Sequence, residues 1–329
     1  MQARLLMISK LLHIYLLIKK SKTHCIVEKQ IYSYEEAFED SLRYFQGDEL
    51  AARVWVNKYA VKDSFGNIYE KSPKDMHWRL ANEVARIEAK YPNALSSEQL
   101  FELFDHFKYI VPQGSPMTGI GNDYQVASLS NCFVIGIDGS ADSYGAIIKI
   151  DEEQVQLMKR RGGVGHDLSH IRPKGSPVKN SALTSTGLVP FMERYSNSTR
   201  EVAQDGRRGA LMLSVSIKHP DSEAFIDAKM TEGKVTGANV SVKLDDAFMS
   251  AAVESRKYTQ QYPIDSDHPT TVKEIEASNL WKKIVHYFRL YRFTVCSNIL
   301  IKGHVTERSG STQCILIIDH IVRCDCRYG

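Results

Sequence analysis

Cys132 is the one cysteine in the regularly patterned body of this 329-residue chain, at the junction between the polar run SLSN and the apolar run FVI. Two interpretations are open. Free cysteines are among the most buried residues in proteins, so the thiol can be a small apolar core group. Alternatively, it is a redox thiol at the mouth of a strand, although no neighbour in the sequence is of a type that would lower its pKa.

Two glycine-containing stretches carry arginines. The first is RRGGVG, residues 160–165, with Arg172 a few residues later, and the second is DGRRGA, which contains Arg207 and Arg208. Backbone N–H groups of glycine runs can bind an anion, and guanidinium groups pair with oxyanions. Neither stretch has the spacing of a dinucleotide or Walker motif. Each alone is equally well explained as a charged turn, but together they favour a nucleotide-sized anionic ligand.

A hydroxyl and two histidines are weaker candidates. Ser115 lies in the stretch GSPM, whose composition is typical of a turn. His166 and His170 are four residues apart, with no cysteine or carboxylate at metal-ligand spacing. We therefore predict no metal site.

The composition is that of an ordinary globular protein, with 43% apolar and 25% charged residues. A net charge of +3 is too small to indicate nucleic-acid or membrane binding. Six cysteines in this length do not form a disulfide framework, which favours a cytoplasmic protein. The apolar run in residues 1–20 is interrupted by Lys10 and His13 and is too short to span a bilayer.

The elements that would position these residues fall into two parts. Helical periodicity and caps at Ser33 and Ser72 predict a helical domain over residues 30–113. Strands alternate with helices over 114–286, which predicts an α/β fold with parallel strands and a loop at the glycine run. Residues 1–29 and 287–329 have no pattern that continues either part.

Five ordered motifs, SLSNCFVIG, DSYGAI, RRGGVGHDLSHIRPKGSP, GRRGALMLSV and KVTGANVSV, resemble the catalytic subunit of ribonucleotide reductases. The resemblance runs from about Tyr32 to about Val285, and residues 49–81 are most similar to the adenosylcobalamin-dependent branch. It implies a helical domain followed by the first half of a ten-stranded α/β barrel. It also implies reduction of ribonucleoside di- or triphosphates, a thioredoxin-type reductant and a homodimer.

The resemblance also implies roles for individual residues. Cys132 matches one of the two thiols that reduce the ribose 2′ position and end as a disulfide. The matches to substrate-binding positions are Ser115, Asn131 and Gly163. The matches to the site for deoxynucleotide or ATP effectors are Asp142, Ser143 and Arg172, with Arg207 and Arg208 on the loop that conveys effector identity to the substrate base.

The sequence departs from the family pattern after about His286. The Asn-x-Cys-x-Glu segment that carries the radical cysteine in the family, and the partner redox thiol, are expected further along and do not occur. From this we expect an inactive, truncated or frameshifted fragment of a reductase. The alternative is a module that binds deoxynucleoside triphosphates without catalysis.

Overall fold

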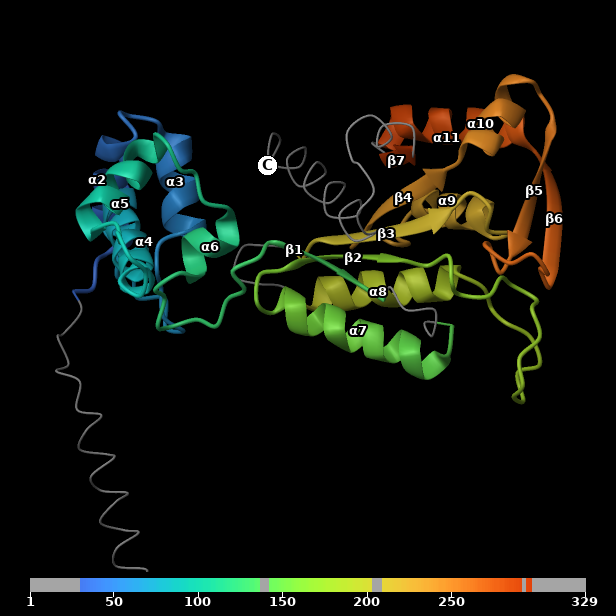
Figure 1. Ribbon diagram of the computed structural model, residues 1–329, viewed down its shortest axis with the longest axis horizontal. Coiled ribbons are helices and arrows are strands. Elements are labelled where there is room, and N and C mark those ends of the chain that lie inside the picture. Colours follow the sequence, from blue (N-terminus) through green and yellow to red (C-terminus); the bar gives the residue numbers. More distant parts are fainter. Residues whose placement is uncertain (1–29, 137–141, 203–208, 292–293, 298–329) are drawn as a thin grey trace, which may run out of the picture. The chain divides into compact units, whose positions relative to one another are not determined.

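The computed structural model describes residues 30–136, 142–202, 209–291 and 294–297. The described residues up to Tyr109 form one compact unit and those from Ile110 form another (Figure 1).

The first unit is helical. Its helices are α2 (Tyr34–Tyr44), α3 (Glu49–Lys58), α4 (Pro73–Glu88) and α5 (Ser97–Phe104), followed by the short turn η1 (Asp105–Phe107). Ser33 and Glu36 form the predicted capping box at the start of α2. The core includes Trp55, whose indole N–H donates to the sulfur of Met76. Helix α3 was not predicted from the sequence.

The second unit is an α/β structure. It contains α6 (Gly114–Gly119), β1 (Cys132–Ile135), α7 (Tyr144–Met158), β2 (Gly163–Asp167), α8 (Val189–Glu201) and β3 (Leu211–Ser216). It continues with α9 (Ser222–Met230), β4 (Asn239–Leu244), α10 (Asp246–Val253), β5 (Lys257–Tyr262), β6 (Thr271–Glu276), α11 (Ala277–Tyr291) and β7 (Thr294–Ser297). Among the described residues, no helix is both long enough and apolar enough to cross a membrane.

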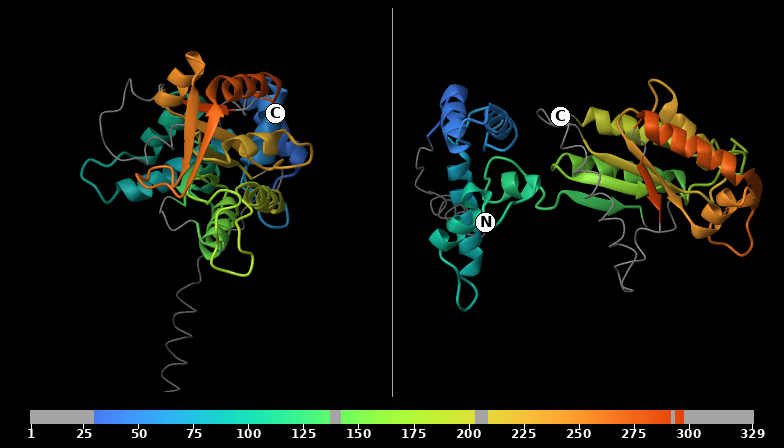
Figure 2. Two further views of the ribbon diagram at one scale, coloured as in Figure 1. Left: turned by 90° about the vertical axis from the view of Figure 1, so that its right-hand side faces the viewer. Right: turned by 90° about the horizontal axis from the view of Figure 1, so that it is seen from above.

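Five strands form one sheet in the order β1-β2-β3-β4-β7, and every neighbouring pair is parallel. Strands β5 and β6 form a separate antiparallel hairpin, which lies at the right-hand end of the sheet in Figure 1 and in front of it in the left view of Figure 2. A helical part followed by a parallel α/β part confirms the predicted fold class, and it is consistent with the first half of the barrel.

One face of the sheet forms the core of this unit. Alternate residues of the central strands, such as Leu213 and Val242, are fully buried among apolar residues of α7, α8 and α9. The other face carries small and polar residues. Because side chains in a strand alternate between faces, Cys132, Gly163 and Asp167 project from this second face.

Three expectations about the elements need correction. The glycine run is not a loop, because Gly163–Asp167 is the buried strand β2 between β1 and β3. The regular pattern also continues past residue 286, since α11 reaches Tyr291 and Thr294–Ser297 pairs with β4. In addition, GSPM begins the short helix α6 rather than forming a turn.

Candidate functional site

Four of the predicted residues meet where strands β1 and β2 begin. Cys132 and Gly163 are paired in register. Asn131 joins the group, because its main-chain carbonyl accepts from Gly163 N–H at 2.6 Å and its side-chain Oδ1 accepts from Ser115 N–H at 2.7 Å. Ser115 is fully buried, and its hydroxyl donates to the carbonyl of Arg161 at 3.1 Å. Cys132 itself is half-buried.

The glycines at this place are required by close approach of neighbouring groups. A Cβ on Gly162 would lie 2.8 Å from the ring of Phe133, and one on Gly163 would lie 3.2 Å from the carbonyl oxygen of Asn131. The glycine run therefore packs strand β2 against β1 and does not form an isolated anion-binding turn.

The face of the sheet that carries Cys132 also holds a charged pair that the sequence did not indicate. Lys243 Nζ lies 2.6 Å from Asp167 Oδ2, while Asp167 Oδ1 accepts from the hydroxyls of Ser169 at 2.7 Å and Ser214 at 3.3 Å. In the next strand Ser241 is 1% exposed, and its hydroxyl has no hydrogen-bond partner among the described residues. The alternation in NVSVKL places Lys243 on the same face as Ser241, but nothing in the sequence pairs it with Asp167.

His166 points to the opposite face, among the helices. It is 4% exposed, its Nε2 lies 3.1 Å from Oε1 of Gln154, and its ring packs edge-on against Tyr195. Burial lowers the pKa of His166 to about 3, against a small opposing effect of Asp167. It is a neutral core histidine, and no group of metal-binding side chains occurs among the described residues.

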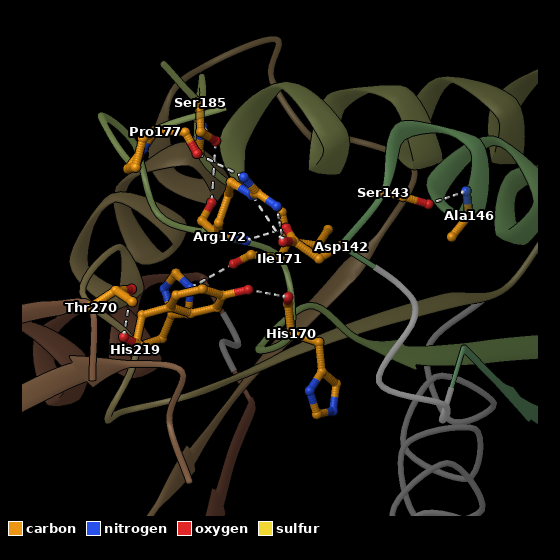
Figure 3. A network of polar contacts seen from close by, with 12 residues as sticks. Asp142, Ser143, Ala146, His170, Ile171, Arg172, Pro177, Ser185, His219 and Thr270 are labelled. Atoms are coloured by element: carbon orange, nitrogen blue, oxygen red, sulfur yellow. Dashed lines mark hydrogen bonds and ion pairs between the residues drawn. The ribbon is translucent and has the colours of Figure 1, made fainter. Parts of the chain in front are cut away.

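The predicted effector residues form a second cluster (Figure 3). The carboxylate of Asp142 accepts from the backbone N–H of Arg172 at 2.8 Å and from its Nε at 2.8 Å, and Arg172 Nη1 donates to the carbonyl of Pro177. These contacts raise the pKa of the Arg172 guanidinium. The hydroxyl of Ser143 caps α7 by accepting from Ala146 N–H at 3.1 Å. Asp142 thus joins the start of α7 to the segment after β2, whereas the hydroxyl of Ser143 bonds within α7 itself.

Arg207 and Arg208 lie outside the described residues. The segment that follows them rejoins the first cluster, because the carbonyl of Ala210 accepts from Val164 N–H at 2.9 Å. The methyl of Ala210 would lie 3.4 Å from a Cβ on Gly163. The end of the predicted effector loop is therefore hydrogen-bonded to the residue that follows Gly163.

A cavity of about 330 Å³ lies elsewhere, between α10 and the hairpin. None of the predicted site residues lines it; its lining residues are Lys218, Ala247, Ala251, Arg256, Lys257, Tyr258, Thr259 and Gln261. Each of its three cations has a carboxylate within ion-pair distance, so the cavity has no marked excess of positive charge.

Comparisons with known proteins match both units. Residues 130–297 match the family model "Ribonucleotide reductase, barrel domain", and residues 45–118 match "Ribonucleotide reductase, all-alpha domain".

Individual relatives show the same relationship. The Mycobacterium tuberculosis protein named vitamin B12-dependent ribonucleoside-diphosphate reductase is 30% identical over 61% of this chain and 29% of its own length. The ribonucleoside-diphosphate reductase subunit alpha of Helicobacter pylori is 28% identical over 75% of the chain and 33% of its own length. A Thermoplasma acidophilum vitamin B12-dependent reductase is 24% identical over 82% of the chain and 41% of its own length. The chain thus spans about a third of these relatives.

Proposed function

This chain belongs to the ribonucleotide reductase family, and on that premise we propose that it carries the nucleotide-reducing thiol and the effector site of such an enzyme. The observation that supports this most strongly is the meeting of Ser115, Asn131, Cys132 and Gly163 at the start of β1 and β2. Cys132 and Gly163 are paired on neighbouring strands, and Asn131 links them to Ser115 in helix α6. The substrate would be a ribonucleoside di- or triphosphate.

Cys132 would supply one of the two thiols consumed in the reduction. The ribose C2′–OH becomes C2′–H, the hydroxyl leaves as water, and two thiols lose two electrons in forming one disulfide. The second thiol is not assigned to a described residue of this chain. A thioredoxin-type dithiol would then reduce the disulfide and return the thiols to their starting state.

Asn131 and Ser115 would position the substrate. The side chain of Asn131 is held by Ser115 N–H, and the Ser115 hydroxyl proton is committed to the carbonyl of Arg161. Because Ser115 is fully buried, its part would be to hold the side chain of Asn131 in place. Gly163 offers close backbone approach without a side chain in the way.

Asp142, Ser143 and Arg172 would bind the triphosphate effector, with Arg207 and Arg208 carrying its identity toward the substrate. The Arg172 guanidinium already donates to Asp142 and Pro177, so an effector would have to share or exchange these contacts. The hydrogen bond between Val164, which follows Gly163, and the carbonyl of Ala210 gives a physical route between the two sites. We further propose that the working enzyme is a homodimer.

Adenosylcobalamin is the proposed radical source of the complete enzyme, because several relatives carry vitamin B12 in their names. When bound, that cofactor would supply the radical chemistry that starts the reduction. The two buried histidines described in the second unit are already engaged, since His166 bonds to Gln154 and His219 bonds to the carbonyl of Ile171. We assign no described residue to the corrin.

The substrate site is tested by alkylation of Cys132 in the full chain. Cytidine diphosphate is expected to slow modification of Cys132 by iodoacetamide at least several-fold, and Asn131→Ala is expected to abolish this protection. Peptide mass mapping distinguishes Cys132 from the other cysteines. Equal alkylation rates with and without nucleotide would contradict the proposed substrate site.

The effector site is tested by equilibrium binding of deoxythymidine triphosphate. Arg172→Ala removes the guanidinium that pairs with Asp142. Arg194→Ala is the matched control, because Arg194 pairs with another carboxylate of the same unit, Asp151, at 2.9 Å. Binding is expected to weaken at least tenfold in Arg172→Ala only. Triphosphate binding without protection of Cys132 would favour the second candidate, a nucleotide-binding module without catalysis.

A further inference from the structure

Three consecutive residues at the predicted effector site, His170, Ile171 and Arg172, are each held by a different part of the chain (Figure 3). Asp142 at the start of α7 binds Arg172, as described above. The carbonyls of His170 and Ile171 are held by two residues that lie much further along the sequence. Neither of these two residues was a candidate in the sequence.

Tyr262, at the end of hairpin strand β5, holds the first carbonyl. Its hydroxyl donates to the carbonyl of His170 at 2.8 Å, across 92 positions of sequence. The same hydroxyl lies close to the predicted effector pair: burial and then the carboxylate of Asp142 raise the pKa of Tyr262 to about 12, while Arg172 opposes the rise. The hairpin therefore holds the chain two residues before Arg172.

His219 holds the second carbonyl. It is fully buried, its Nδ1 accepts from the backbone N–H of Asp221 at 3.0 Å, and its Nε2 lies 2.8 Å from the carbonyl of Ile171. Since Nδ1 is an acceptor, the proton is on Nε2, which donates to Ile171. The rings of His219 and Tyr262 also pack edge to face with centroids 5.8 Å apart.

The hairpin is itself fixed to the turn that carries His219. Gln261 N–H donates to the carbonyl of Lys218 at 2.7 Å, and the buried side chain of Gln260 donates to the carbonyl of Ile217 and the hydroxyl of Ser222. Tyr262 and His219 thus belong to segments that are hydrogen-bonded to each other. Together they bind the carbonyl groups of the two residues immediately before Arg172.

We propose that Tyr262, supported by His219, is a positioning residue of the effector site: the hairpin β5–β6 sets the backbone of Arg172 so that its guanidinium is presented next to Asp142 for an anionic nucleotide. This inference rests on the proposed function, because it assumes that Arg172 binds the effector. It goes beyond that function by assigning the hairpin, a segment outside both predicted sites, to effector recognition.

The test compares Tyr262→Phe with Tyr258→Phe in the full chain. Tyr258 is the matched control, because it lies on the same strand and loses an equivalent bond, from its hydroxyl to Asp245 at 2.7 Å. Amide hydrogen exchange over residues 168–176 is expected to rise about fivefold in Tyr262→Phe, the effect of one lost hydrogen bond, and to stay unchanged in Tyr258→Phe. The dissociation constant for deoxythymidine triphosphate is expected to rise by a similar factor in Tyr262→Phe alone.

A double-mutant cycle separates positioning from general stability. The Arg172→Lys variant replaces the planar guanidinium with an ammonium group, whose binding depends less on orientation. In this variant, Tyr262→Phe is expected to change the dissociation constant much less than it does in the unmodified chain. Exchange unchanged over residues 168–176, or equal nucleotide binding by the unmodified chain and Tyr262→Phe, would overturn the inference. No nucleotide binding by the unmodified chain would instead overturn the proposed effector site, and with it this role for Tyr262.

Discussion

Asn131 uses its side chain to hold Ser115 and its main chain to hold Gly163, at 2.7 Å and 2.6 Å respectively. One residue therefore joins helix α6 to the starts of β1 and β2. Cys132 follows it directly, so the position of the thiol depends on these two bonds.

Replacing Asn131 is expected to loosen the proposed substrate site. Asn131→Ala leaves the buried N–H of Ser115 without an acceptor, which costs about 1–3 kcal/mol of unfolding free energy. Asn131→Asp retains an acceptor and should lose less. Urea denaturation measures both variants, and equal stability of Asn131→Ala and the unmodified chain would show that the Ser115 contact contributes nothing.

Two glycines are expected to respond in opposite directions to alanine. A Cβ on Gly163 would meet the carbonyl of Asn131 at 3.2 Å inside the sheet, so Gly163→Ala should destabilise by about 1–3 kcal/mol. Gly145 lies in the first turn of α7 with nothing within 4 Å of an added Cβ. Gly145→Ala should therefore stabilise by about 0.5–1 kcal/mol. Thermal unfolding of both variants checks the sign of each change.

Ser143 is expected to contribute to stability independently of any ligand. Its hydroxyl caps α7, so Ser143→Ala should cost about 1 kcal/mol, whereas Ser143→Asp keeps a capping oxygen and should be close to neutral. Urea denaturation without nucleotide measures this contribution. If Ser143→Ala weakens nucleotide binding by more than the loss in stability explains, the hydroxyl also contacts the effector.

Acid should destabilise the second unit through His166. Burial lowers the pKa of His166 from 6.5 to about 3, so below pH 6.5 the unfolded chain takes up a proton that the folded chain does not. The stability contribution is present at pH 7 and is lost as the pH falls toward 3, by about 2 kcal/mol between pH 7 and pH 5. Urea unfolding at both pH values should show a smaller difference in His166→Leu, and an unchanged difference would assign the acid sensitivity to other groups.

Most of the helices and the strands β1, β3 and β4 were predictable, because their side chains display the period of the element. Strand β2 was not predicted. Gly163 and Gly165 leave one of its faces without side chains, so the sequence does not show the alternation of side-chain types that marks a strand. The hairpin β5–β6 was missed because its sequence is largely polar on both faces. The family resemblance, stated from five ordered motifs, is confirmed by the matching family models.

The candidate site was only partly visible in the sequence. Asn131 and Cys132 are adjacent, and the resemblance linked them to Gly163; their roles remain predictions. The ion pair of Lys243 with Asp167 spans 76 positions, and the bond from Tyr262 to His170 spans 92. No local pattern marks such pairs, because the sheet and the docked hairpin bring them together.

The strand order β1-β2-β3-β4-β7 matches the order of synthesis, so each strand of the sheet pairs with the one made before it. The growing chain can add every new strand to an existing edge as it leaves the ribosome, without waiting for a distant segment. The hairpin between β4 and β7 is a local antiparallel pair that closes on itself in the same interval. Vectorial assembly during translation is therefore built into the topology of this sheet.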